Sequence, residues 1–174
     1  LHAGASGGAL FYPEYHFDMV RMGIALYGYP PQKSPVMFLP CLELTAEVTF
    51  VKEIKAGESV GYGCTFTANR LMRVATLGIG YGDGYPRALS NRGRVLIHGV
   101  SCPVIGRVCM DQCMADVSAL EGVVPGDEAV MIGRRGTEAV GADELAELCG
   151  TIPYEILLLP GRRVPRYYPQ DEEN

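Results

Sequence analysis

The sequence predicts a mainly β fold that follows a short α/β segment. Residues 42–51 alternate apolar and polar side chains, which is the period of a half-buried strand. Only residues 142–149 have the pattern of a helix, and Gly150 follows them as a typical C-terminal stop. The other apolar runs are short and bounded by Gly, Pro or Asn, and they predict strands at 71–80, 94–98, 103–110, 113–118, 128–133 and 163–168.

The start of the chain has a different pattern. Leu1–Ala3 predict the end of a strand, and the small residues Gly4–Gly8 predict a turn that opens a helix. A second strand, a glycine turn and a short helical piece are expected over 18–28. The prolines that follow Tyr29 indicate a linker, because proline neither continues a helix nor donates to a sheet. We therefore expect a first domain over residues 1–38 and a second over 39–174.

The composition is that of a folded protein with a real core. Hydrophobic residues make up 48% of the 174 residues and charged residues 20%. The net charge of −5 and the pI near 5.2 give no electrostatic reason to expect a nucleic-acid partner. No apolar run approaches the roughly 20 residues of a membrane span. The chain opens on Leu1 without a signal-peptide pattern, from which we expect a piece of a longer protein.

The cysteines predict neither disulfides nor a metal site. Their spacing is irregular and no secretory context is visible, which favours free thiols in a reducing compartment. Cys109 and Cys113 face one side if their segment is extended, but their spacing does not fit a zinc knuckle and His98 lies among apolar residues. We therefore interpret these two cysteines as small buried apolar residues.

Two glycine-containing turns near the start of the chain are candidates for anion binding. Ser6 lies in a turn that opens a predicted helix, and Gly23 and Ile24 follow a predicted strand. Free backbone N–H groups together with a serine hydroxyl can hold a phosphate. From these residues alone, a helix cap at Ser6 and a simple turn at Gly23 are the plainer interpretation.

Arg21 is unusual because it lies in the apolar run Met19–Gly23. An unpaired guanidinium is costly to bury, so the side chain either points to solvent or meets an acceptor at the end of the strand. In the second case His2, at the end of the preceding strand, is a candidate to orient it.

Glycine-flanked polar residues mark the second domain. Tyr62 stands between Gly61 and Gly63, where the backbone can approach a neighbour closely. A phenol is a poor base at neutral pH unless a cation is near, and most such tyrosines pack or form interfaces. The segments Gly80–Arg87 and Gly106–Gln112 place tyrosine, arginine and aspartate around tight turns, although Asp83 can equally serve its own turn.

Together these motifs resemble those of the alanine racemase family. Each one is weak alone, but their joint order and spacing along nearly the whole chain are highly specific. The matching segments are His2–Ala3 with Ser6, 20–28, 62–65, 80–87, 106–112, 151–155 and 163–166.

The resemblance implies a fold and an assembly. Members of the family have an N-terminal (β/α)₈ barrel that binds pyridoxal phosphate, followed by a mainly β C-terminal domain. They act as head-to-tail homodimers in which the C-terminal domain of one subunit completes the active site of the other. On this resemblance, residues 1–38 are the last strand and helix elements of the barrel, and the chain belongs to a cytoplasmic enzyme that supplies D-alanine for peptidoglycan precursors.

The resemblance also implies roles for single residues. Ser6, the backbone of Gly23 and Ile24, and Tyr154 would bind the cofactor phosphate. Arg21, with His2 behind it, would hydrogen-bond the pyridine nitrogen and keep it unprotonated, because arginine is always protonated. The ring is then a weaker electron sink, which disfavours transamination.

For the substrate, Tyr62 would be the second catalytic base, opposite the cofactor lysine. The Met110 N–H would hold the carboxylate, and Tyr81, Arg87 and Arg107 would line the access route of the amino acid.

Two departures from the family pattern stand out. Ala5 replaces the asparagine that usually precedes the serine at position 6. The only lysines are Lys33, Lys52 and Lys55, and none lies in a motif like that of the cofactor lysine. We therefore expect that the isolated chain neither binds pyridoxal phosphate covalently nor racemises.

Two other interpretations remain open. A serine or serine/alanine racemase anchored in a membrane shares this domain, so its motifs hardly distinguish the substrates. A β module that has lost catalysis and serves only in association is also possible by fold alone, although an uncovered barrel strand edge would favour aggregation.

Overall fold

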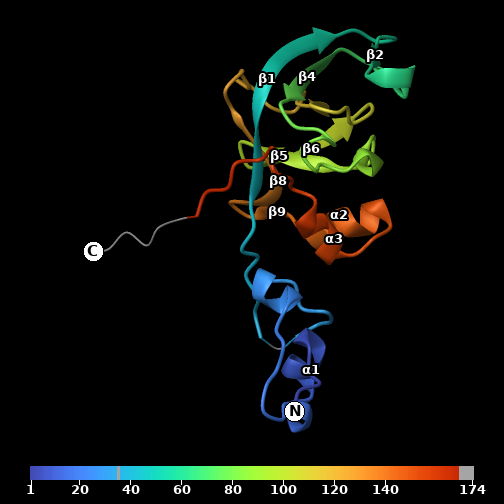
Figure 1. Cartoon of the computed structure of the whole chain (residues 1–174). Helices are drawn as coiled ribbons and strands as arrows, with labels where there is room; N and C mark the ends of the chain where they lie inside the picture. Colours follow the sequence, from blue (N-terminus) through green and yellow to red (C-terminus); the bar gives the residue numbers. More distant parts are fainter. Residues whose placement is uncertain (35, 169–174) are drawn as a thin grey trace.

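The computed structural model describes residues 1–34 and 36–168 of the chain. Figure 1 shows a β-rich body with an N-terminal extension that projects from one end of it. The strands are β1 Leu44–Ile54, β2 Ser59–Val60, β3 Phe66–Thr67, β4 Met72–Leu77, β5 Arg94–Ile97, β6 Val100–Ile105, β7 Cys113–Asp116, β8 Glu128–Arg135 and β9 Glu138–Val140. The helices are α1 Ser6–Phe11, α2 Ala142–Cys149 and α3 Pro153–Leu158, and the 3₁₀ turns are η1 Pro13–Tyr15, η2 Ile24–Tyr27, η3 Tyr62–Cys64 and η4 Arg87–Leu89.

The body is an antiparallel sheet that closes on itself. Its strand order is β1-β4-β7-β6-β5-β8-β9, and β1 also pairs with β8. The first half of β1 pairs with β8 and the second half with β4, with a register shift between Val48 and Phe50. A bulge of this kind turns a strand, and here it lets one long strand close the ring and leaves Phe50 55% exposed. The mainly β prediction is confirmed.

The sequence placed most strands but not all their limits. The strand expected over 103–110 is β6, which starts at Val100 and ends at Ile105, because Gly106 with φ +73° turns the chain out of the sheet. Helix α2 has the predicted bounds 142–149. The strand expected over 163–168 is wrong, since this segment forms turns and irregular chain and contains Pro165, which has no N–H to donate. The sequence analysis missed β2, β3, β9 and α3.

The two strands expected in the extension are also not formed as such. Leu1–Gly4 and Asp18–Arg21 lie side by side, with the N–H of Asp18 donating to Leu1 O at 3.1 Å and that of Arg21 to Gly4 O at 2.8 Å. The direction is parallel, but these two bonds do not make a ladder that counts as a sheet. The expected helix does begin at Ser6.

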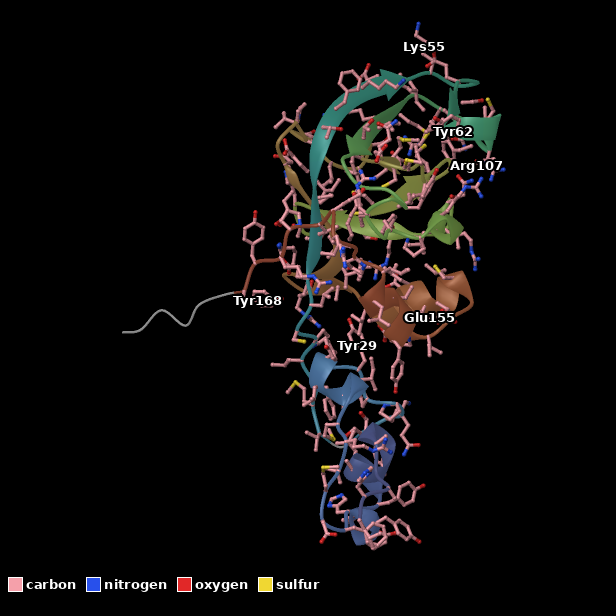
Figure 2. The ribbon with its side chains drawn as sticks, viewed as in Figure 1. Tyr29, Lys55, Tyr62, Arg107, Glu155 and Tyr168 are labelled. Carbon is pink, nitrogen blue, oxygen red and sulfur yellow. The ribbon has the colours of Figure 1, made fainter. Side chains whose placement is uncertain are left out.

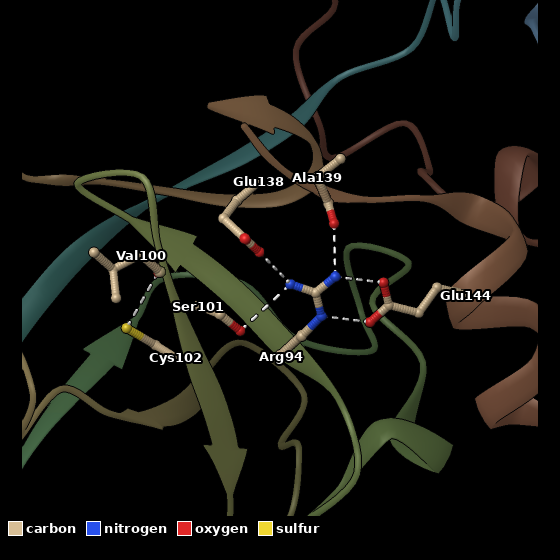
Figure 3. A network of polar contacts seen from close by, with 7 residues as sticks. All are labelled: Arg94, Val100, Ser101, Cys102, Glu138, Ala139 and Glu144. Atoms are coloured by element: carbon tan, nitrogen blue, oxygen red, sulfur yellow. Dashed lines mark hydrogen bonds and ion pairs between the residues drawn. The ribbon is translucent and has the colours of Figure 1, made fainter. Parts of the chain in front are cut away.

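A bidentate ion pair ties α2 to the sheet (Figure 3). The guanidinium of Arg94, on β5, donates to both carboxylate oxygens of Glu144 at 2.7 Å, and also to the carbonyl oxygen of Ala139, on β9, at 2.7 Å. The hydrogen bonds to Glu144 raise the pKa of Arg94. One side chain therefore joins β5, β9 and α2, and the core below α2 contains the fully buried Leu145 and Ile97.

A smaller apolar cluster lies under the β2–β3 hairpin. It is made of Ile54, Val60, Ala68, Met72, Val74, Ile105 and Met114, with Phe66 packed against it. Because short strands of two residues have little stability alone, this cluster is what holds the hairpin and the turn η3 between its strands.

Within the described residues, none of the helices is long and apolar enough to span a membrane. The same part of the chain contains no cluster of three His, Cys, Asp or Glu side chains that could bind a metal ion.

Candidate functional site

Ser6 and the turn at Gly23 form one compact polar group in the extension. The Ser6 side chain is buried, with 4% of the residue exposed, and its Oγ accepts N–H bonds from Gly23 at 3.0 Å and Ala25 at 3.4 Å. A serine hydroxyl accepts two hydrogen bonds and donates one, so the O–H remains free to donate. The N–H of Ile24 has no acceptor among the described residues. Two neighbouring donors of this group thus have no acceptor in the described part of the chain, as an anion site requires.

Arg21 lies beside this group and is exposed. Its backbone N–H donates to Gly4 O, and its guanidinium reaches Ala3 O at 3.4 Å. His2 is exposed as well, and no hydrogen bond between His2 and Arg21 occurs in the described chain. The structure therefore places the arginine next to the Ser6 group and leaves its remaining N–H groups available.

Tyr62 stands at the opposite end of the molecule, on η3, and 72% of it is exposed. The backbone under it is held by close contacts between 60–61 and 106–107. Gly106 has φ +73°, and a Cβ there would lie 2.7 Å from Val60 O. Gly61 has φ +74°, and a Cβ there would lie 3.2 Å from the Arg107 N. These two glycines let the loops touch, so the phenol projects from a fixed support.

Figure 2 shows Arg107, one of the three expected access residues, close to Tyr62. Its Nε would lie 3.4 Å from a Cβ on Gly63, so the guanidinium covers the turn that carries the phenol. Tyr81 is 44% exposed and follows β4. Arg87 begins η4 and is exposed, and no contact of its guanidinium occurs among the described residues.

Met110 lies on the loop between β6 and β7, where 52% of it is exposed. The loop is tight, because the Cys109 N–H donates to Gln112 O at 2.9 Å. The Met110 N–H finds no acceptor in residues 1–34 and 36–168. Between this loop and Tyr62 lies a hollow of about 480 Å³, lined by Lys52, Ser59, Val60, Gly61, Tyr62, Val74, Thr76, Cys109, Gln112 and Met114.

Tyr154 is the second residue of α3, and 46% of it is exposed. Figure 1 shows α3 on the side of the β body that faces the extension. The Tyr29 hydroxyl links the extension to the neighbouring helix, since it accepts the N–H of Ala142 at 3.1 Å. No hydrogen bond joins Tyr154 to Ser6 in the described chain.

The expected site residues thus fall into two separate groups. The first contains Ser6, Arg21, Gly23 and Ile24, in the extension, and the second contains Tyr62, Tyr81, Arg107 and Met110, in the β body. Figures 1 and 2 show the extension at one end of the molecule, and Tyr62 with Arg107 at the other. One chain does not bring the two groups together.

The sequence analysis missed an ion-pair cluster that lies behind the second group. Arg163 pairs with Asp83 at 3.2 Å and with Asp111 at 2.5 Å. The other carboxylate oxygen of Asp83 accepts the N–H of Gly80 at 3.0 Å, which is the hydrogen bond within its own turn that the sequence suggested. The sequence analysis expected a strand at Arg163, and the local sequence Arg163-Val164-Pro165 does not reveal its ion-pair partners.

The residues present fit the phosphate and the ring of pyridoxal phosphate but not its covalent attachment. The buried Ser6 hydroxyl and the Ile24 N–H can donate to a phosphate, and Arg21 beside them has free N–H donors for a ring nitrogen. Lys33 is exposed in the linker, and Lys52 and Lys55 are exposed at the far end of β1 (Figure 2). No hydrogen bond or ion pair joins any of them to the Ser6 group among the described residues.

Known sequences match both parts of the chain. The profile of the alanine racemase C-terminal domain matches residues 41–168, and that of the alanine racemase N-terminal domain matches residues 1–31. The alanine racemase of Symbiobacterium thermophilum is 51% identical over 170 residues, and that of Carboxydothermus hydrogenoformans is 48% identical over 171. These alignments cover 96% of this chain but 45% and 46% of the relatives, so the chain spans about half the length of the proteins it matches.

Solved structures agree with the sequence relatives. The alanine racemase of E. faecalis superposes with a TM-score of 0.91 at 37% identity, over 97% of this chain and 46% of that one. The Bartonella henselae alanine racemase, solved with covalently bound pyridoxal phosphate, superposes with a TM-score of 0.88 at 36% identity, over 95% of this chain and 45% of that one. With a matched profile over most of its length and this fold, the chain belongs to the alanine racemase family.

Proposed function

We propose that this chain is the C-terminal part of a pyridoxal-phosphate-dependent alanine racemase that interconverts L- and D-alanine for peptidoglycan precursors. In this proposal residues 1–38 end the cofactor-binding barrel, and residues 39–174 form the β domain. The matches of the two family profiles to residues 1–31 and 41–168 support this division. We further propose that the enzyme is cytoplasmic and works as a head-to-tail homodimer.

The observation that carries the proposal is the exposed Tyr62 on its rigid support, far from the Ser6 group. A packing tyrosine buries its ring, but Tyr62 is 72% exposed beside Arg107 and a hollow that also borders the 109–112 loop. A head-to-tail dimer brings the Tyr62 end of one subunit to the Ser6 end of the other, so each site receives both groups.

The chain's own residues divide the work of a racemase. When bound, pyridoxal phosphate supplies an electron sink that makes the proton on the substrate Cα removable. Ser6, the backbone of Gly23 and Ile24, and Tyr154 hold its phosphate, and Arg21 donates to its ring nitrogen. The Tyr62 phenol takes or returns the Cα proton on one face. The N–H of Met110 holds the substrate carboxylate. Tyr81, Arg87 and Arg107 line the route by which the amino acid reaches the site.

Subunit complementation tests this arrangement. One variant of the full-length protein is Tyr62→Phe, which removes the base. The other is Gly23→Asp, which puts a carboxylate at the phosphate group, where a Cβ has room because its nearest neighbour is Ser6 Oγ at 3.8 Å. Each variant alone is expected to lose at least about 100-fold in kcat. A refolded equal mixture should recover about one quarter of the wild-type activity, because half of the dimers then contain one intact site of two.

The rates are measured in both directions with alanine, and with serine to distinguish a serine/alanine racemase. Cofactor content identifies the Gly23→Asp variant as the one that loses binding. A mixture no more active than its components would contradict a site shared between subunits. Wild-type protein without racemase activity on either amino acid would reject the function itself.

A further inference from the structure

Three loops that are distant in the sequence meet behind Met110 and Tyr81. They are the turn 80–84, the loop 109–111 and the C-terminal segment 159–163. Backbone hydrogen bonds join the first two, from the Tyr81 N–H to Cys109 O at 3.0 Å and from the Gly82 N–H to Met110 O at 2.8 Å. A third bond joins the turn to the C-terminal segment, from the Gly161 N–H to Asp83 O at 3.2 Å.

Arg163 is the side chain that joins all three loops. Its Nε pairs with Asp83 Oδ1 at 3.2 Å, and its Nη2 pairs with Asp111 Oδ1 at 2.5 Å. The two partners differ in exposure, since the Asp83 side chain is 14% exposed and that of Asp111 is 62% exposed. The nearly buried Asp83 therefore anchors the guanidinium of Arg163, and Arg163 in turn restrains Asp111 on the exposed loop 109–111.

Gly82 leaves the room that this contact needs. A Cβ at Gly82 would lie 2.5 Å from Arg163 Nη1 and 3.0 Å from Met110 O. The guanidinium thus lies over the same peptide that donates to the Met110 carbonyl. The Met110 carbonyl is thus held by the Gly82 N–H, while the Met110 N–H has no acceptor among the described residues.

We propose that Arg163 is a positioning residue for substrate binding, which joins Asp83 to Asp111 and thereby fixes the Met110 N–H that holds the substrate carboxylate and the neighbouring Tyr81. The inference rests on the function proposed above. Misplacing one donor by a fraction of an ångström weakens binding of the carboxylate, but it leaves the Tyr62 base and its support in place.

The variants Arg163→Gln, Arg163→Lys and Asp111→Asn of the full-length protein, loaded with pyridoxal phosphate, test the role. Arg163→Gln is expected to raise KM for both enantiomers of alanine roughly tenfold with kcat within about twofold. Lysine keeps the positive charge but lacks the planar guanidinium that can reach two carboxylates at once. Arg163→Lys should therefore raise KM less than Arg163→Gln does, but still above the wild-type value. Because both partners act in one contact, Asp111→Asn added to Arg163→Gln should cause little further loss.

Arg70→Gln is the matched control. Arg70 pairs with Asp116 at 3.1 Å, its side chain is 55% exposed against 53% for Arg163, and Asp116 is 13% exposed against 14% for Asp83. This ion pair lies outside the three loops, so the control should keep the wild-type KM.

Amide hydrogen exchange gives a readout that does not depend on turnover. Arg163→Gln should speed exchange at the Tyr81 and Gly82 amides, which donate to the 109–111 loop, and Arg70→Gln should not. A wild-type KM and wild-type exchange in Arg163→Gln, or fully additive effects with Asp111→Asn, would overturn the inference. If the wild-type protein does not racemise, the proposed function and the positioning role fail together, while exchange still shows separately whether Arg163 holds the loops.

Discussion

At the scale of single residues, Tyr62 and Tyr85 differ in exposure and in the contacts of their hydroxyl groups. Tyr62 is exposed on a support of two touching loops, whereas Tyr85 is completely buried four residues after Tyr81. Burial raises the pKa of Tyr85 well above its ordinary value. Its hydroxyl is the buried side-chain atom without a hydrogen-bond partner in the described chain, and a Cβ at Gly93 would lie 3.0 Å from it.

The orphaned hydroxyl predicts an unusual stability effect. Tyr85→Phe should leave the free energy of unfolding unchanged or increase it by about 1 kcal/mol, because it removes a buried group that has lost its water without gaining a partner. Tyr29→Phe is the matched control, since the Tyr29 hydroxyl accepts the buried Ala142 N–H and its removal should cost about 1 kcal/mol. Urea unfolding of both variants measures the difference. A loss of more than about 1 kcal/mol in Tyr85→Phe would show that the hydroxyl has a partner, such as a buried water.

At the scale of elements, ring closure and the attachment of α2 shape the β body. The bulge in β1 allows one strand to pair with both β4 and β8. Arg94 then fixes α2 and β9 to β5 through Glu144, Glu138 and Ala139. The side chains of Arg94 and Glu144 are 30% and 32% exposed, so solvent screens this ion pair only in part.

A double-mutant cycle at Arg94 and Glu144 measures this attachment. Arg94→Ala is expected to cost about 2 kcal/mol of unfolding free energy, because it also removes the donors to Ala139 O and Glu138. The coupling between Arg94→Ala and Glu144→Ala should be about 1 kcal/mol. The coupling between Arg70→Ala and Asp116→Ala should be below about 0.5 kcal/mol, because that pair has a single contact and its arginine is 55% exposed. Equal couplings for the two pairs would show that the bidentate geometry adds nothing.

At the scale of the whole molecule, the two groups of site residues lie at opposite ends (Figure 1). Lys52 and Lys55 belong to the end far from the Ser6 group, and Lys33, in the linker, lies in no motif like that of the cofactor lysine. On the proposed function, the chain therefore contributes parts to two different sites and completes neither.

This separation predicts the behaviour of the isolated chain of 174 residues. It should form no stoichiometric covalent adduct with pyridoxal phosphate and should not racemise alanine, because none of its lysines lies in a motif like that of the cofactor lysine and it cannot place Tyr62 near the Ser6 group. Borohydride reduction followed by mass spectrometry tests for the adduct, and chiral chromatography tests for D-alanine. The full-length protein is the positive control, and racemisation by the isolated chain would contradict the prediction.

The sequence predicted much of the fold because local patterns decided it. The alternation in β1 and the helix pattern of α2 with Gly150 placed those elements closely. The family motifs singled out Tyr62, Ser6, Arg21 and Met110 as site residues, and their roles stay predictions. The strand expected over 163–168 failed because Pro165, within the segment, has no N–H to donate to a neighbouring strand.

What the sequence determined by itself is the class of the fold, the family and the residue types of the site, since these follow from patterns within short segments. Only the tertiary structure decided that β1 closes the sheet, that Arg163 reaches Asp83 and Asp111, and that Ser6 and Tyr62 lie far apart. The Arg163 pairs join residues separated by 80 and 52 positions, as 163 − 83 and 163 − 111 give. Contacts over such separations depend on how whole elements pack, and no local pattern records them.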